Sequence, residues 1–166
     1  MEPLARTALD YRLAGRLGVA TGVVLAAASA LHRPVVEVAA LWVLGALLAA
    51  PVMYLLVYRR LLHRDLGRAG PAPADAPQEG APARRRRIVA PIMLFMLVLG
   101  AATLLLRFDA GAIAGLATGQ GAAAIAAALW LERWERRHDA LVLSRAGGWR
   151  RSTVVARGPA QRPFEP

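Results

Sequence analysis

Four long apolar stretches constrain this chain more than any other feature of its sequence. They cover residues 13–31, 35–58, 88–106 and 110–131. Each has about the 20 residues that a helix needs to cross a bilayer. Turns of three residues join the first stretch to the second and the third to the fourth. Turns this short connect antiparallel helices, so we expect an all-α membrane protein whose four transmembrane helices form two αα hairpins.

The basic residues, all of them arginine, lie almost entirely on one side of these spans. Only Arg33 and Arg107 of the 21 fall in the short turns, and the others lie toward the opposite ends of the spans. Arginine beside a span stays in the cytoplasm, so we expect both termini inside (N-in, C-in), in a bacterial inner membrane. A net charge of +10 in a soluble protein would indicate nucleic acid. Its position beside the spans indicates anionic lipid headgroups instead, and we expect no nucleic-acid partner.

The first stretch has a second interpretation. Arginines precede an apolar run that ends in Ala28-Ser29-Ala30, which is the pattern of a secretory signal with its cleavage site. Cleavage would leave three spans. The return of a second span after only three residues favours the hairpin.

The spans divide the chain into parts. We expect a first hairpin over 1–66, a linker over 67–87, a second hairpin over 88–139 with a cytoplasmic helix extension, and a basic tail over 140–166. The first 12 residues predict a lead that is partly helical along the membrane surface. The linker is rich in Pro, Ala and Gly, which indicates an extended or disordered segment that buries nothing. Apolar clusters around Gly147-Gly148 indicate a small β-hairpin in the tail, because glycine supplies positive φ.

Small residues recur at every fourth position in two of the spans. The two stripes include Gly18, Gly22 and Ala26 in the first span, and Gly111, Gly115 and Gly119 in the fourth. Positions i and i+4 share one helix face, and small residues there let backbones approach closely in lipid. The stripes predict helix packing within the chain or between copies. The alternative is that Gly and Ala are merely abundant.

Few polar side chains interrupt the spans. Glu37 lies two residues inside the outer end of the second span. We expect its negative charge to be favourable at this helix start and to pair with Arg33 or Arg107; the alternative is a cation or proton site. Gln120 lies near the middle of the fourth span and predicts a hydrogen bond to a neighbouring helix, the alternative being a pore or polar ligand. Pro51 predicts a kink in the second span.

Directly before the third span stands a run of basic residues. It comprises Arg84, Arg85, Arg86 and Arg87. We expect it to hold that end of the span in the cytoplasm and to bind anionic headgroups.

The sequence contains no recognisable catalytic motif. It has no cysteine, which excludes disulfides and thiolate chemistry. Its histidines lie outside all four spans, where haem ligands are not expected. Glu135 and His138 have a Glu-x-x-His spacing, but a di-iron bundle needs that motif twice with two more glutamates. We interpret the pair as a surface contact and expect no enzyme activity, cofactor or metal.

These features favour a non-catalytic accessory, assembly or scaffold subunit of a bacterial membrane complex, which binds other membrane-protein subunits or further copies of itself. The alternative is a small transporter or channel that works as a homo-oligomer, with Pro51, Gln120 and Glu37 near its path. A lipid-modifying enzyme ranks third, because ionisable residues are missing from the middle of the spans.

The topology can be tested with reporter fusions. Fusions after Gly70 and at Pro166 should report the cytoplasm, and fusions at Arg33 and Phe108 the outside, because arginine stays inside. An external reporter at Pro166 would contradict both the charge argument and the hairpin assignment.

Overall fold

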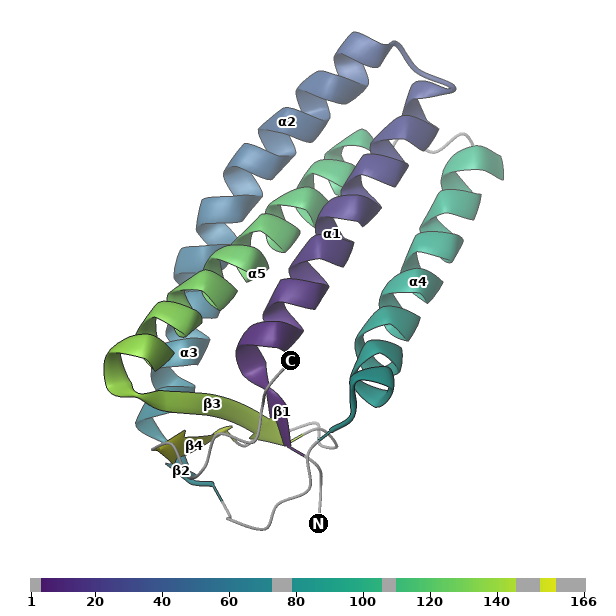
Figure 1. Cartoon of the computed structure of the whole chain (residues 1–166). Coiled ribbons are helices and arrows are strands. Elements are labelled where there is room, and N and C mark those ends of the chain that lie inside the picture. The colour runs from purple at the N-terminus through teal and green to yellow at the C-terminus, as the bar shows by residue number, and fades with distance from the viewer. Residues whose placement is uncertain (1–3, 73–78, 106–109, 146–152, 158–166) are drawn as a thin grey trace.

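A computed structural model describes residues 4–72, 79–105, 110–145 and 153–157. Helices make up most of this part, together with a small sheet (Figure 1). The helical segments are α1 (Thr7–Ala30), α2 (Val35–Val52), the π-helical η1 (Met53–Tyr58), α3 (Arg59–Gly67), α4 (Ala81–Leu105) and α5 (Gly111–His138). The strands are β1 (Leu4–Arg6), β2 (Gly70–Pro71), β3 (Ala140–Arg145) and β4 (Thr153–Arg157).

The helices stand side by side on the sheet, which lies across one end of the bundle (Figure 1). α5 packs against both α1 and α2, whereas α4 packs mainly against α1. The first and last described strands, β1 and β4, belong to the same sheet. The two ends of the described chain therefore lie on the same side of the bundle.

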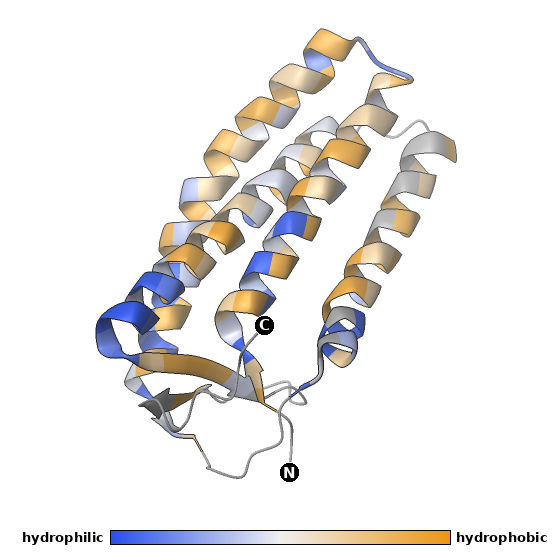
Figure 2. Cartoon of the chain, in the orientation of Figure 1, coloured by the Kyte–Doolittle hydropathy of each residue, from blue (hydrophilic) through white to orange (hydrophobic). Residues whose placement is uncertain are grey.

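Three helical segments are long and apolar enough to cross a membrane: Thr7–Ala30, Val35–Gly67 and Gly111–His138. The protein is thus a multi-pass membrane protein by the length and composition of its helices. α4 is a fourth long helix, and its membrane crossing stays a prediction. Figure 2 shows apolar residues along α2 and on α4, with hydrophilic residues gathered near the sheet.

The sheet is larger than the predicted hairpin. β3 and β4 pair antiparallel, with Leu143 opposite Val154, so the hairpin is confirmed, although Gly147-Gly148 lies outside the described residues. β1 extends it antiparallel to β3, and β2 pairs parallel to β4, giving the order β1-β3-β4-β2. An all-α fold was therefore only partly right.

Two local predictions were only partly right, because the sheet recruits distant segments. The N-terminal lead is partly helical, since α1 begins at Thr7, but Leu4–Arg6 form strand β1. The linker is bound to the sheet on both sides of residues 73–78, which lie outside the described part. Before this gap β2 pairs with β4, and after it the Glu79 N–H donates to the Leu4 carbonyl at 2.9 Å. Glu79 itself is 8% exposed, so the linker does bury a side chain.

The turn from α5 into the sheet needs no loop. Asp139 adopts a left-handed conformation with φ 46°, and its N–H donates to the Glu135 carbonyl. Aspartate tolerates this region better than most residues. β3 begins at the next residue, and Val142 packs into a cluster with Leu62 and Leu131. The sheet is thereby joined to the helix ends through an apolar core.

Pro51 is followed by a change of helix type. It lies in the last turn of α2, and the chain is π-helical from Met53 to Tyr58 before α3 begins. Proline has no N–H to donate, and its ring clashes with the carbonyl of the preceding turn. A π-helical turn is one of the structural changes that accompany bends in helices. The helix type therefore changes one residue after Pro51's turn ends, and the predicted kink itself stays a prediction.

Glycines bring α5 and α1 into backbone contact. A Cβ built on Gly121 would lie 2.6 Å from the Gly15 carbonyl oxygen, and one on Gly18 would lie 3.0 Å from the Gly121 Cα. A Cβ on Gly22 would lie 2.5 Å from the Ala114 carbonyl oxygen. Two further stripe positions, Ala26 and Gly111, are also buried.

The other face of α5 meets α2 in the same way. A Cβ on Gly115 would lie 2.5 Å from the Trp42 carbonyl oxygen and 2.9 Å from the Gly45 Cα. A Cβ on Gly119 would lie 2.6 Å from the Ala49 Cβ. The two predicted stripes therefore do not pack on each other. The stripe in α1 faces Gly121 and its neighbours, while Gly115 and Gly119 face α2.

Gly115→Leu should lower the melting temperature in detergent. The new side chain has no room against Trp42 and Gly45, and overpacking of this kind costs about 1–3 kcal/mol. Leu116→Ile is the matched control, because Leu116 is 54% exposed and the change conserves volume. Equal melting shifts for the two variants would mean that the α5–α2 contact does not stabilise the bundle.

Candidate functional site

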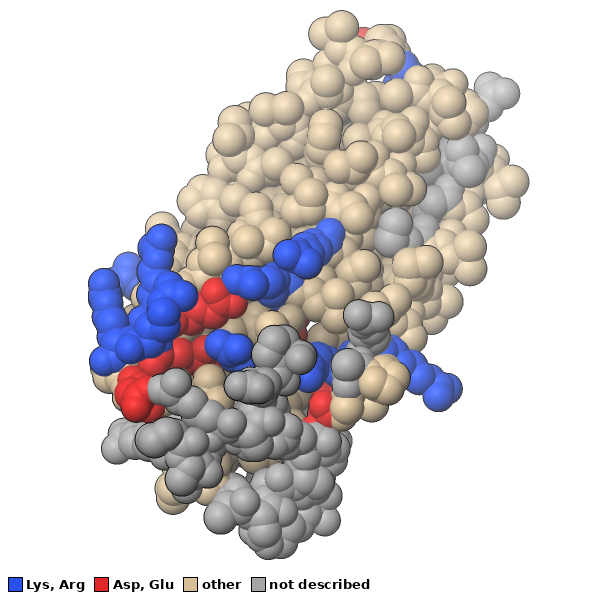
Figure 3. All heavy atoms as spheres, in the orientation of Figure 1, with Lys and Arg blue, Asp and Glu red and all other residues tan. Residues whose placement is uncertain are grey.

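Charged side chains gather at the sheet end of the molecule, and the visible face of the helices above them is nearly free of charge (Figure 3). Glu135 on α5 connects this helix to the sheet, and the residue is only 4% exposed. Its Oε2 accepts a hydrogen bond from Arg6 Nη2 at 2.8 Å, and its Oε1 accepts one from the Val142 N–H at 2.9 Å. One carboxylate therefore binds α5 to both β1 and β3.

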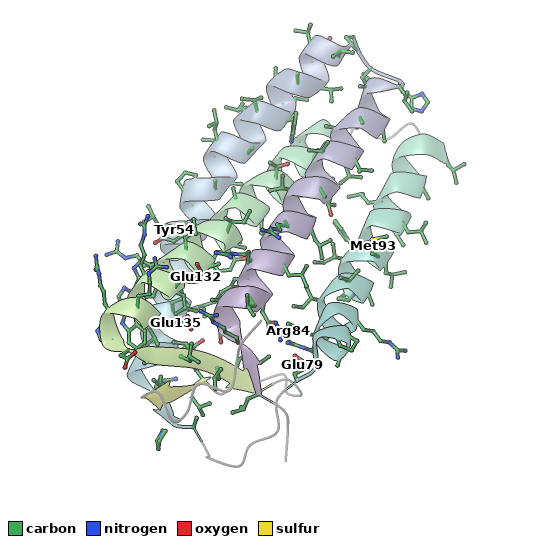
Figure 4. The ribbon with its side chains drawn as sticks, viewed as in Figure 1. Tyr54, Glu79, Arg84, Met93, Glu132 and Glu135 are labelled. Atoms are coloured by element: carbon green, nitrogen blue, oxygen red, sulfur yellow. The ribbon has the colours of Figure 1, made fainter. Side chains whose placement is uncertain are left out.

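The interpretation of Glu135 and His138 as a surface pair was wrong. Glu135 points into the sheet contact, whereas His138 stacks on Trp134 with ring centroids 4.2 Å apart. One turn away, Glu132 pairs with Arg12 of α1 at 2.7 Å in a more exposed setting. Figure 4 shows Glu132 and Glu135 close together on α5 above the sheet.

A second ionic cluster attaches α4 to the bundle. Arg87 donates from Nε and Nη2 to the two carboxylate oxygens of Glu79, at 3.0 and 2.9 Å, and from Nη2 to Asp10 Oδ2 of α1 at 2.8 Å. Hydrogen bonding to Glu79 raises the pKa of Arg87, burial opposes the rise, and Asp10 adds to it. Arg87 is thus held as a cation between two carboxylates, which is the arrangement that satisfies a buried charge.

The described side chains of the arginine run lie in different surroundings, and binding of anionic headgroups by the run stays a prediction. Arg87 is committed to Asp10 and Glu79. Arg84 is half-buried, and its Nε is buried without a hydrogen-bond partner in the described part of the chain. Arg86 is exposed, and the side chain of Arg85 lies outside the described residues. Glu79 and Arg84 lie together at the foot of α4 (Figure 4).

Between α4 and the rest of the bundle lies an open groove with a volume of about 1200 Å³. Residues of α1, η1, α3, α4, α5 and β4 line it. Its ionisable groups are concentrated near the sheet: Asp10, Arg64, Asp65, Arg68 and Arg87. Among its lining residues, Tyr11 of α1 meets Tyr58 of η1 edge to face, with ring centroids 5.4 Å apart.

A smaller cavity of about 260 Å³, called here the slot, adjoins the groove and shares several of its walls. The shared residues are Ala14, Tyr58, Pro91, Ile92 and Gln120. Beyond them the slot is lined by small and apolar side chains, including Gly18, Ala117 and Phe95. The groove is thus polar near the sheet and becomes apolar along the helices.

The two polar residues singled out in the spans lie in different places. Gln120 is exposed and lines both cavities, and no hydrogen bond to a neighbouring helix is found for it among the described residues. Glu37 is exposed in the first turn of α2 and does not line the groove. Arg107, a predicted partner of Glu37, lies outside the described part. The two residues therefore do not line a common cavity among those found in the described part of the chain.

Sequence reasoning missed the inter-helix hydrogen bond that does occur. Trp42 Nε1 donates to Thr118 Oγ1 at 2.8 Å, and Thr118 Oγ1 donates in turn to the Ala114 carbonyl at 2.9 Å. It also missed Gly45 and Gly121 as contact residues. Gly45 and Ala49 repeat the four-residue spacing in α2, and that spacing was the available signal.

No family model, curated protein or solved structure matches the chain. Within the described ranges there is no group of three or more His, Cys, Asp or Glu residues placed to hold a metal ion.

Glu135→Ala should destabilise the protein more than Glu132→Ala. Removing Glu135 strands a half-buried Arg6 and a buried Val142 N–H, and breaking a buried pair costs about 3–5 kcal/mol. The Arg12–Glu132 pair is more exposed, with side-chain accessibilities of 36% and 14%, and should contribute about 1 kcal/mol or less. Urea or thermal unfolding in detergent measures both. Equal losses would contradict a special role for Glu135.

Proposed function

We propose that this protein is a non-catalytic, four-span accessory or scaffold subunit of a membrane complex in a bacterial inner membrane. In this proposal α4 is the fourth span, and the sheet lies in the cytoplasm together with both termini. The arginines beside the spans support that orientation, because they gather at the sheet end (Figure 3).

The main support for the proposal is the way in which the ionisable side chains are paired. Among the ion pairs found in the described residues, Arg6–Glu135 joins helix to sheet, Arg12–Glu132 and Arg87–Asp10 join helix to helix, and Arg87–Glu79 joins α4 to the segment before it. An enzyme or proton-coupled carrier places such groups at membrane depth, where they meet a substrate or ion. Here they position helices, which is the requirement of a subunit that presents a fixed surface.

The packing of the helices supports the same function. α1, α2 and α5 approach at their backbones, which gives a unit with little freedom to rearrange. The outer faces of α2 and α4 carry exposed large apolar side chains, among them Leu47, Leu48, Leu94 and Leu97. In the membrane these faces are available to lipid and to neighbouring subunits.

Purification from native membranes in mild detergent tests the proposal. The full-length protein should migrate with one or more other membrane proteins in reproducible stoichiometry, measured by size-exclusion chromatography with light scattering and mass spectrometry. A monomer without a copurifying protein in several mild detergents would contradict it. A defined homo-oligomer alone would also contradict it and favour the second candidate, a small transporter or channel, which the position of Gln120 in the cavities supports.

A further inference from the structure

We propose that the groove between α4 and the η1–α3 segment is a binding site for one anionic phospholipid. The headgroup lies at the sheet end, near Arg64 and Arg68, and an acyl chain extends into the slot beside Ile92 and Phe95. This inference requires the helices to lie in a membrane, but it does not depend on the protein being an accessory subunit.

Cationic side chains line the polar end of the groove. Arg64 lies in the last turn of α3, Arg68 is the residue that follows the helix, and both line the groove. Both are exposed, and no hydrogen bond or ion pair of either side chain is found in the described part of the chain. Thr153 of β4, which carries a hydroxyl group, also lines the groove. Arginine and hydroxyl donors are the groups that recognise phosphate oxygens.

The acidic residues of the groove do not cancel this charge. Asp10 already binds Arg87, whose second partner is Glu79. That cluster is one cation between two carboxylates and is an unfavourable partner for another anion. Asp65 lies between Arg64 and Arg68 in sequence, is half-buried, and makes an interaction of its own. A phosphate is therefore best placed on the α3 side of the groove.

The apolar end has the form that an acyl chain requires. Gly18, Ala117 and Gly121 line the slot without large side chains, and Phe95 of α4 also lines it. Along α1 the two cavities extend from Asp10 to Thr21, which is about 16 Å at 1.5 Å per residue. That is about half of the ~30 Å hydrocarbon core. The groove and slot together thus match the depth of one leaflet.

This shape favours a phospholipid over a soluble phosphate compound. A small hydrophilic anion would fill the polar end and leave the apolar slot empty. A phospholipid satisfies both ends, because its charged headgroup and its chains are arranged in the same order along the helices. Pro91, Ile92 and Tyr58 line both cavities, so one molecule would contact α4 and η1 together.

Native mass spectrometry of the delipidated full chain in detergent tests the charge recognition. The protein is titrated with phosphatidylglycerol, phosphatidylcholine or glycerol 3-phosphate. Phosphatidylglycerol should bind with one-to-one stoichiometry and most tightly. Replacing both arginines, Arg64→Gln with Arg68→Gln, should weaken that binding roughly tenfold or more, since each arginine near an anionic surface contributes to it. The control, Arg59→Gln with Arg60→Gln, removes two exposed charges from the same helix outside the groove and should bind as the wild type does.

A second pair of variants tests the slot independently of charge. Ile92→Trp should fill the junction of the two cavities and reduce phosphatidylglycerol binding, while Leu94→Trp adds the same bulk at an exposed position of α4 that lines neither cavity. The proposal is overturned if the Arg59/Arg60 control loses as much affinity as the Arg64/Arg68 variant. It is equally overturned if glycerol 3-phosphate binds as tightly as the lipid, or if both tryptophan variants bind alike.

Discussion

The approach of α5 to two helices at once is the contact on which the rest of this structure depends. In lipid, helices gain nothing from burying apolar surface against each other, so close packing and hydrogen bonds must hold them. Gly121 meets α1 on one face of α5, and Gly115 meets α2 on another. The Trp42–Thr118 hydrogen bond reinforces the second contact. With α1 and α2 fixed on α5, the positions of the chain ends that form the sheet are fixed as well.

The sheet and the ion pairs hold together segments that are far apart in sequence. β1 comes from the N-terminus, β2 from the linker, and β3 and β4 follow α5. Glu135 and Arg87 secure this end, because each bonds to two different elements or segments. Helix α4 has few other connections, and its contact with α1 is less extensive than those of α5. The open groove beside it is a consequence of that arrangement.

Helices α1, α2 and α5 form a closely packed core, whereas α4 is attached more loosely. This difference bears on function. The ionisable groups that a transporter or enzyme would place within the membrane are used here at the sheet end. The groove is the exception, because Arg64 and Arg68 reach it without partners of their own among the described residues. A scaffold subunit with a bound lipid is consistent with both observations. The lipid would then fill the space that separates α4 from η1 and α3.

The sequence by itself indicated that the helices lie in a membrane. It also indicated the helical hairpin in the first third of the chain and the β-hairpin of the tail. These follow from the length of apolar runs and from local turn chemistry, which need no knowledge of distant contacts. The four-residue spacing of small side chains likewise marked helix faces that make close contacts, because periodicity is a local property. It could not say which face meets which helix.

Only the tertiary structure decided which residues and segments of the chain pair with each other. Leu4–Arg6 has too few residues to indicate a strand, and it becomes one only because β3 offers an unpaired edge. Glu135 and Arg87 look like surface charges in the sequence, and only the fold brings Arg6, Val142, Asp10 and Glu79 to them. Hydrogen bonds and ion pairs between residues far apart leave no periodic trace in the chain. The groove depends on where α4 stands relative to η1 and α3. That placement rests on the contacts of α4 with α1, which include the Arg87–Asp10 pair, and no local pattern in the sequence indicates it.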